Sequence, residues 1–99
     1  MNFLYEGEGI YYNEDGSIFY KGQFKNCLRH GKGMQYYPNG KIEYEGDFLD
    51  DKKEGNGKHY FEDGSYEIGQ WKNDLQEGNF KQYDKNGKEI GAKTYENGR

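Results

Sequence analysis

The chain has 99 residues and a net charge of −4, with its basic residues dispersed among acidic ones. This length fits one domain, and the absence of a basic stripe argues against nucleic acid as the main partner. No segment approaches the roughly 20 apolar residues of a membrane-spanning helix, and a single cysteine excludes an intrachain disulfide. The mean hydropathy of −1.38 is typical of disorder, but 11 tyrosines, 6 phenylalanines and 1 tryptophan supply apolar surface for a sheet.

Short aromatic runs alternate with turn signals along the chain. The glycine-centred turns contain Gly16, Gly40, Gly64 and Gly87, and Asn-Gly and Asp-Gly pairs favour hairpins. Longer polar loops are expected at 25–30, 49–54 and 72–77. We therefore predict strands near 8–13, 17–24, 32–37, 41–48, 56–61, 65–72, 79–83 and 88–95. The expected fold is all-β: a single-layer antiparallel meander of β-hairpin repeats that forms a short twisted solenoid.

One phrase recurs along this meander: aromatic-x-Gly-x-aromatic, then Gly-x-Gly, a tyrosine and a turn glycine. Its clearest copies begin at Tyr20 and Tyr44, and Gly7, Gly31 and Gly55 are spaced by 24 residues. A fixed period of this length indicates a repeat architecture. We predict one domain over 1–99, made of a partial repeat, two full repeats and a degenerate one, at 1–19, 20–43, 44–66 and 67–99.

The phrase decays toward the C-terminus. The third copy has one residue fewer between its turn and its glycine, over 64–69, and we assign the loss to the turn. Glu67 stands where the first ring is expected. In the fourth copy Phe80 replaces the second glycine, and Gly91-Ala92 replaces the aromatic-x-Gly phrase. Such a repeat is typical of a terminal cap, and a piece of a longer array is the alternative.

The aromatic rows are the predicted partner-binding surface. Alternation places Tyr20, Gly22 and Phe24 on one face, where the glycine leaves a gap for a ring of the neighbouring strand. Ring-lined strips bind peptides or helices; the alternative is that the rings only hold the sheet together. The candidate residues are Tyr12, Tyr20, Phe24, Tyr36, Tyr44, Phe48, Tyr60, Trp71 and Tyr83.

Two further expectations concern members of these rows. Tyr12, Tyr36, Tyr60 and Tyr83 recur at one phase, so we expect them to stack into a ladder. Trp71 is the strongest single candidate, because we expect it to be exposed and interfaces are enriched in tryptophan.

No pattern in the sequence indicates catalysis, a cofactor, a metal or a small-molecule substrate. His30 and His59 fall at different repeat phases, and Cys27 lies in a polar loop as an incidental thiol. The Gly-x-Gly pairs lack the third glycine and following helix of a dinucleotide site, and the acidic turns lack calcium-loop spacing. The lone cysteine and the lack of a secretory-signal pattern lead us to expect a cytoplasmic protein.

The recurring phrase resembles the MORN repeat, and its 24-residue copies also resemble the variant MORN repeats of bacteria and protists, some of which are labelled antitoxins. The resemblance covers nearly the whole chain. It implies an elongated scaffold without catalytic residues. Members of the family bind protein segments in an aromatic-lined groove, self-associate, or have been proposed to touch membrane lipids. We therefore expect a protein or peptide partner, with self-association as one form.

Two alternatives stay open beside that expectation. One is a scaffold on a phospholipid surface, although Lys52-Lys53 and Lys25 with Arg29 are fewer than the 4–8 clustered basic residues typical of lipid binding. The other is an antitoxin-like or accessory segment of a longer protein, which includes a segment attached to a catalytic domain.

Overall fold

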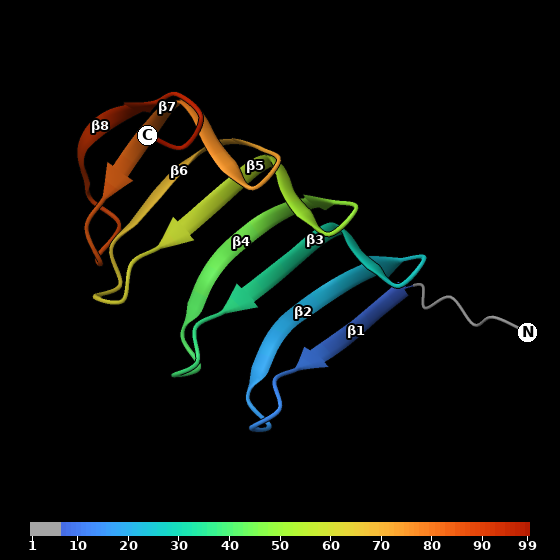
Figure 1. Ribbon diagram of the computed structural model, residues 1–99. Helices are drawn as coiled ribbons and strands as arrows, with labels where there is room; N and C mark the ends of the chain where they lie inside the picture. The colour runs from blue at the N-terminus through green and yellow to red at the C-terminus, as the bar shows by residue number, and fades with distance from the viewer. Residues whose placement is uncertain (1–6) are drawn as a thin grey trace, which may run out of the picture.

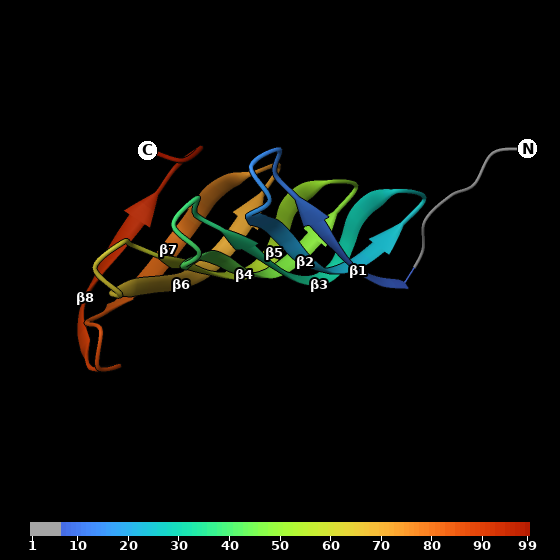
Figure 2. The same cartoon turned by 90° about the horizontal axis from the view of Figure 1, so that it is seen from below.

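A computed structural model describes residues 7–99, which form one open antiparallel sheet in which each strand pairs with its neighbours in chain order (Figure 1). The strands are β1 (Gly7–Tyr12), β2 (Ile18–Lys25), β3 (Leu28–Tyr36), β4 (Ile42–Leu49), β5 (Lys52–Tyr60), β6 (Tyr66–Lys72), β7 (Leu75–Tyr83) and β8 (Glu89–Tyr95). The sheet measures 51 × 26 × 19 Å and twists along its length without closing into a barrel (Figure 2). The predicted single-layer meander is confirmed.

The glycine-centred turns have the expected hairpin form. At the first, Gly16 N donates to Asn13 O at 3.0 Å, and Asn13 N donates to Ser17 O at 2.8 Å. Gly16 has a φ of 91°, which glycine adopts without steric cost. The same pattern of bonds recurs at Gly40, Gly64 and Gly87. These turns join β1 to β2, β3 to β4, β5 to β6 and β7 to β8.

The longer polar loops predicted between the other strands are wrong. Each is a two-residue turn, and β3, β5 and β7 begin four residues earlier than predicted. Both central residues of each turn have a positive φ, as in a type I′ turn, with Asn or Asp first and Cys or Asp second. Asn and Asp tolerate this conformation without glycine. The dipeptides are Asn26-Cys27, Asp50-Asp51 and Asn73-Asp74.

The residue missing from the third repeat is also not where we expected it. Its turn keeps both characteristic bonds, from Phe61 N to Ser65 O and from Gly64 N to Phe61 O. The β3–β4 pairing instead shifts register between Gln35 and Tyr36, whereas β5 and β6 pair without a shift. The third repeat has therefore lost a bulge residue, and its turn is complete.

The two faces of the sheet differ in burial. We call one the ring face, because it carries all the buried rings: Tyr20, Tyr44, Phe48, Trp71, Phe80 and Tyr95. We call the other the groove face; alternation places the neighbouring residues of each strand there. Since the sheet has no second layer, the ring face is the whole core of the described chain.

Candidate functional site

Five of the nine predicted partner-binding residues lie on the ring face. Tyr20, Tyr44, Phe48 and Trp71 are buried, and Phe24 packs against them half-buried. The expected exposure of Trp71 is wrong: 6% of its surface is accessible, because neighbouring rings cover its faces. Its indole Nε1 donates to Gly57 O at 3.3 Å.

The ring-face aromatics form one continuous edge-to-face series. Successive ring centroids are 5.1–5.8 Å apart, with interplanar angles of 79–86°. Edge-to-face pairs of this kind contribute about 0.5–1.5 kcal/mol each beyond their buried area. In order, the series is Phe24, Tyr20, Phe48, Tyr44, Trp71, Phe80 and Tyr95.

The rings lie over glycines of the adjacent strand, as the sequence predicted. A Cβ added at Gly33 would lie 2.4 Å from the ring of Tyr20, and one at Gly57 would lie 2.4 Å from the ring of Tyr44. Tyr44 also donates its hydroxyl to Asp47 O at 2.8 Å. Burial raises the pKa of Tyr20 and Tyr44. Each ring is therefore fixed at both its face and its hydroxyl.

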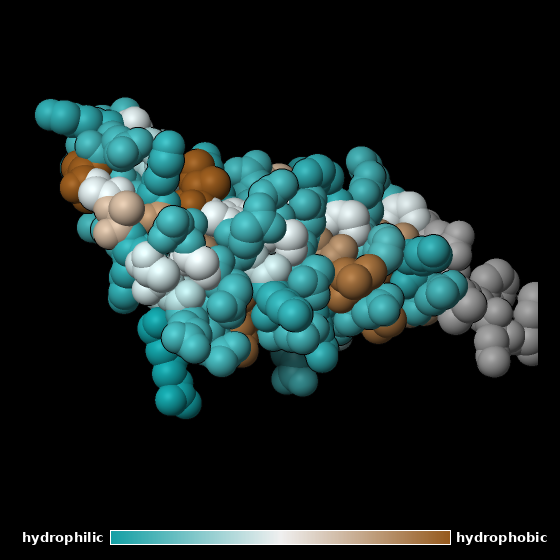
Figure 3. Space-filling model, turned by 90° about the horizontal axis from the view of Figure 1, so that it is seen from above, coloured by the Kyte–Doolittle hydropathy of each residue, from teal (hydrophilic) through white to brown (hydrophobic). Residues whose placement is uncertain are grey.

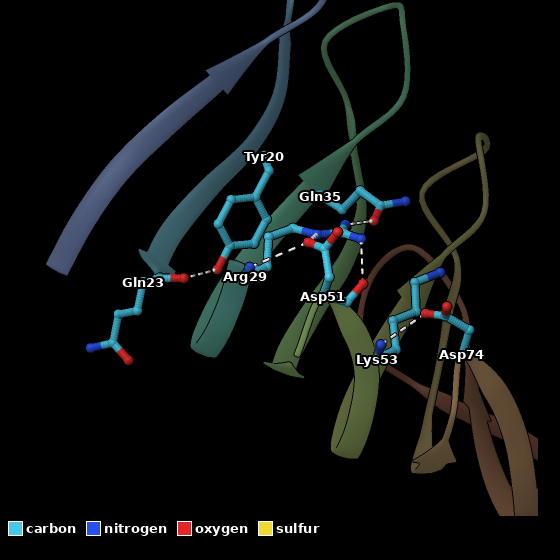
Figure 4. A network of polar contacts seen from close by, with 7 residues as sticks. All are labelled: Tyr20, Gln23, Arg29, Gln35, Asp51, Lys53 and Asp74. Carbon is cyan, nitrogen blue, oxygen red and sulfur yellow. Dashed lines mark hydrogen bonds and ion pairs between the residues drawn. The ribbon is translucent and has the colours of Figure 1, made fainter. Parts of the chain in front are cut away.

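We call the three two-residue turns the tight turns. Arg29 connects the ring series to the tight turn between β4 and β5 (Figure 4). Its guanidinium carbon lies 4.9 Å from the centroid of Phe48, and its Nε donates to Asp51 Oδ1 at 2.7 Å. Its two terminal nitrogens donate to Gln35 Oε1 and to Asp51 O. Asp51 N in turn donates to Arg29 O at 2.9 Å. The β4–β5 turn is thus bound to the preceding Gly-x-Gly strand.

Lys53 repeats the arrangement one unit later. Its backbone N donates to Asp74 Oδ1 at 2.8 Å, and Asp74 N donates to Lys53 O at 3.0 Å. Its ammonium lies 4.9 Å from the Trp71 centroid and 5.2 Å from that of Tyr44. Burial lowers the pKa of Lys53. We call these repeated contacts of Arg29 and Lys53 latches, because each joins a hairpin to the next one. The rings that the latches cover already make their contacts inside the fold.

The third unit differs from the second at two neighbouring positions. It has a smaller side chain where the second unit has a ring, and a ring where the second unit has a glycine. Glu67 takes the place of Tyr44, while Phe80 takes the place of Gly57 and covers Gly69 from the other strand. The Glu67 carboxylate is buried and accepts hydrogen bonds from Tyr95 Oη at 2.7 Å and from Gln76 and Gln82. Burial and this carboxylate raise the pKa of Tyr95 to about 12.

The other four predicted residues, Tyr12, Tyr36, Tyr60 and Tyr83, lie on the groove face. Tyr60 and Tyr83 are joined through Tyr66, which stacks on Tyr83 with centroids 5.0 Å apart and lies 5.5 Å from Tyr60. Tyr36 contacts the sulfur of Met34 at 4.0 Å, and Tyr12 is exposed. The expected ladder of these four tyrosines is therefore wrong: only Tyr60 and Tyr83 are connected, and through Tyr66, which sequence reasoning missed.

A groove of about 660 Å³ crosses β1 to β4 on this face, between the side-chain rows. Its lining includes four glycines that pair with one another across the strands, Gly9, Gly22, Gly33 and Gly46. The side chains around them are Glu8, Ile10, Lys21, Lys32, Met34 and Glu45. In the sequence, this site is indicated by the residues that alternate with the repeated glycines and differ from one repeat to the next. The sequence analysis missed them because it considered only the recurring rings.

The remaining polar candidates do not assemble into a reactive site. Within the described residues, no group of three or more His, Cys, Asp or Glu side chains is placed to hold a metal ion. His59 lies beside Phe61 and Trp71, and burial lowers its pKa. Nδ1 of His30 and of His59 is buried without a hydrogen-bond partner in the part of the chain described. Cys27 is exposed in its turn. Residues 7–99 contain no helix long and apolar enough to cross a membrane.

Comparison with known families identifies the repeat. The family described as MORN repeat matches residues 44–66 and 68–87, and the family described as MORN repeat variant matches residues 5–26 and 29–50. The chain belongs to the MORN-repeat family. Both matched families describe the repeat itself, and no catalytic family is among them. No curated protein matches the sequence. The MORN sheet of this chain carries its aromatic cluster on one face and the groove over β1 to β4 on the other.

Proposed function

We propose that this MORN-repeat sheet is a non-catalytic scaffold that binds an extended protein segment across its groove face. The observation that carries the proposal is the 660 Å³ groove over β1 to β4. Binding pockets of about 300–1,000 Å³ with apolar walls and a few polar groups are typical of ligand sites. The ring face is a poorer surface, because its rings already contact one another and the latches.

The lining indicates what kind of segment would fit. Ile10 and Met34 offer apolar surface from β1 and β3. Lys21 lies between them, and its side chain makes no hydrogen bond or ion pair within residues 7–99. Lys32, by contrast, pairs with Asp47 at 2.6 Å. A segment that places an acidic side chain beside an apolar one would pair with Lys21 and cover Met34.

A peptide library displayed on phage and selected on the purified protein tests this function. Enriched peptides should combine acidic and apolar residues, and Met34→Ala and Lys21→Glu should each weaken their binding in fluorescence titrations. Leu49→Ala is the matched control, because Leu49 is an exposed apolar residue of β4 outside the groove. No enrichment, or binding that Met34→Ala and Leu49→Ala reduce equally, would contradict the groove as the site.

A lipid surface is the second candidate, and the tight turns favour it. Beside each turn an exposed leucine pairs with a lysine across the strands. Figure 3 shows apolar side chains as separate patches within hydrophilic surface, which fits shallow contact only. Flotation with anionic vesicles at several salt concentrations tests this candidate, and no binding at low salt eliminates it. The pairs are Lys25 with Leu28, Leu49 with Lys52, and Lys72 with Leu75.

A further inference from the structure

In the described part of the chain, each of the two outermost strands has one edge that pairs with no other strand, and these strands carry the most accessible large apolar side chains. Among the described residues, β1 pairs only with β2, and β8 pairs only with β7. Of the large apolar side chains in this part of the protein, the three most exposed are Ile90 on β8 and Tyr11 and Tyr12 on β1, at 63%, 58% and 56%. Unpaired edges are templates for the addition of another strand.

The repeat phase makes these two edges complementary. Within the sheet, the aromatic strands β2 and β4 are each followed by a Gly-x-Gly strand, β3 or β5, and β6 is followed by β7, where Phe80 replaces the second glycine. β8 stands at the position of an aromatic strand, and no described strand follows it. β1 is a Gly-x-Gly strand, and no described strand precedes it. The free edge of each therefore corresponds to a pairing already made inside the molecule.

We propose that β1 of a second copy of this chain adds to the free edge of β8, head to tail. The register follows from equivalent positions. Gly91 pairs with Gln82 as Tyr44 pairs with Gln35, so Gly91 stands at the repeat position of Tyr44. Tyr11 pairs with Tyr20 as Gln35 pairs with Tyr44, so Tyr11 stands at the repeat position of Gln35. By the pairings of β2 with β3, Gly91 lies opposite Tyr11 of the second copy.

The same register places Ala92 opposite Ile10 of the second copy. Lys21 pairs with Met34 inside the sheet, and Ala92 stands at the position of Lys21, while Ile10 stands at that of Met34. Ala92 pairs on its other side with Lys81, whose aliphatic stem lies in the same row. The joint therefore buries two apolar side chains on the groove face.

Side-chain size supports the pairing on the ring face. Inside the sheet, large side chains lie against the glycines of a neighbouring strand, as Phe80 lies against Gly69. A Cβ added at Gly91 meets nothing closer than Gln82 Oε1 at 3.7 Å, so the space above Gly91 is open. The Tyr11 ring of a second copy fills that space. The exposed ring at one end and the uncovered glycine at the other are thus matched.

The last turn of the chain leaves this edge accessible. Glu96 and Arg99 exchange backbone bonds at 3.1 Å across the pair Asn97-Gly98, both with a positive φ. Gly98 N donates to Gln76 O at 2.9 Å, in the way that Asp74 N donates to Lys53 O. The turn occupies the edge beside Glu96 only, so the segment from Glu89 to Thr94 can accept a strand. Because the contact is head to tail, it uses each edge once and can extend to further copies.

Sedimentation equilibrium over a range of protein concentrations tests the proposal. The mass should rise above that of one chain as the concentration increases. Ile10→Glu and Ala92→Lys should each return the protein to one chain, because each puts a charge into the apolar joint. An equimolar mixture of the two variants should associate again. Where β8 of Ala92→Lys meets β1 of Ile10→Glu, the introduced ammonium faces the introduced carboxylate. Where β8 of Ile10→Glu meets β1 of Ala92→Lys, the original apolar pair is kept.

Ile68→Glu is the matched control. Ile68 lies in the same groove-face row as Ile10 and is similarly exposed, at 39% against 42%, but β6 is paired on both sides. Its substitution should leave association unchanged. A single-chain mass at every concentration overturns the proposal, as does equal weakening by Ile68→Glu and Ile10→Glu or a mixture that stays monomeric. Ala92→Lys lies outside the groove, so selected peptides should still bind it, which separates this test from that of the proposed function.

Discussion

The glycines beneath the rings hold their positions for steric reasons. A Cβ at Gly57 would lie 2.4 Å from the Tyr44 ring, which Asp47 O also holds through its hydroxyl. Gly57→Ala should lower the free energy of unfolding by about 1–3 kcal/mol, the usual cost of overpacking. Urea denaturation measures this. Gly91→Ala is the control: its nearest contact is 3.7 Å away, and we expect a change within about 1 kcal/mol. Equal losses would contradict ring-over-glycine packing.

Tyr95 predicts a dependence of stability on alkaline pH. Its pKa is raised to about 12 by burial and by the Glu67 carboxylate, against about 10 in an unfolded chain. The folded state therefore binds this proton more tightly, and the resulting stability is complete below pH 10 and is lost as the pH rises toward 12. Tyr95→Phe should lower the free energy of unfolding at neutral pH by about 1.5–3 kcal/mol and should flatten the alkaline decline.

Urea denaturation at a series of pH values measures both effects. Tyr83→Phe is the comparison, because Tyr83 stacks on Tyr66 through its ring and phenylalanine keeps that contact. If Tyr95→Phe follows the same alkaline curve as the unmodified protein, the bond to Glu67 does not carry the effect. Tyr20, Tyr37 and Tyr44, whose pKa burial also raises, should account for the decline that remains.

His59 predicts the opposite dependence. Burial first, and Lys53 second, lower its pKa below the ordinary value of about 6.5; the carboxylates of Glu67 and Glu43 oppose the shift. The unfolded chain therefore binds the proton more readily, so stability falls as the pH drops below about 6.5. Gln35 stands at the equivalent position one repeat earlier. His59→Gln should remove this part of the acid dependence in denaturation curves, and an unchanged acid limb would contradict it.

The sequence predicted which residues are aromatic neighbours but not which of them are accessible. Alternation placed Tyr20 and Phe24 on one face, and the rings cover glycines as expected. Trp71 was expected to be exposed because a single layer leaves both faces open. That reasoning omitted Lys53 and Tyr44, which come from the preceding repeat, and Phe80 of the next strand, which together cover the indole. Side-chain coverage across repeats depends on the twist of the sheet, which alternation along one strand does not contain.

At the scale of elements, the tight turns connect neighbouring hairpins. The Asp51 carboxylate accepts hydrogen bonds from the side chain and the backbone N of Arg29. Asp50 contributes to the turn only through its backbone, which has a positive φ of 47°. Asp51→Gly keeps the backbone conformation but removes the carboxylate, so unfolding should require about 1–2 kcal/mol less. Asp50→Gly should change stability by less than about 0.5 kcal/mol. Thermal denaturation of the two variants compares them, and equal melting temperatures would show that the latch adds nothing.

The same turns show where element prediction failed. The strand ends that flank the glycine-centred turns were located within about one residue, because Asp-Gly and Asn-Gly are strong local signals. The strands that begin at Leu28, Lys52 and Leu75 were truncated, because their first turn-side residues are mostly charged or polar and resemble a loop. Their pairing depends on positive φ at Asn and Asp, and on latches to a strand more than 20 residues away.

For the whole molecule, the linear strand order predicts graded stability. Each strand pairs only with its chain neighbours, and β1 and β8 have one partner each within the described residues. Hydrogen exchange should therefore be slowest in β3 to β6 and fastest in β1 and β8, as in other repeat proteins. Amide exchange followed by NMR measures this. Equal protection in all eight strands would indicate a single cooperative unit.

Glu67 stands in the place of a tyrosine and Phe80 in the place of a glycine, so the third hairpin differs from the others. This difference fixes which hairpins can pair with one another in the array. A slip of one repeat in one direction would bring Tyr44 against Phe80, two large side chains at one site. A slip in the other direction would leave Glu67 over the bare backbone of Gly57 without its three donors. Copies that share one spacing and one pattern of rings and glycines could otherwise pair in several frames. A buried carboxylate and a displaced ring thus discriminate between those frames during folding, so the irregular third unit defines the order of the regular ones.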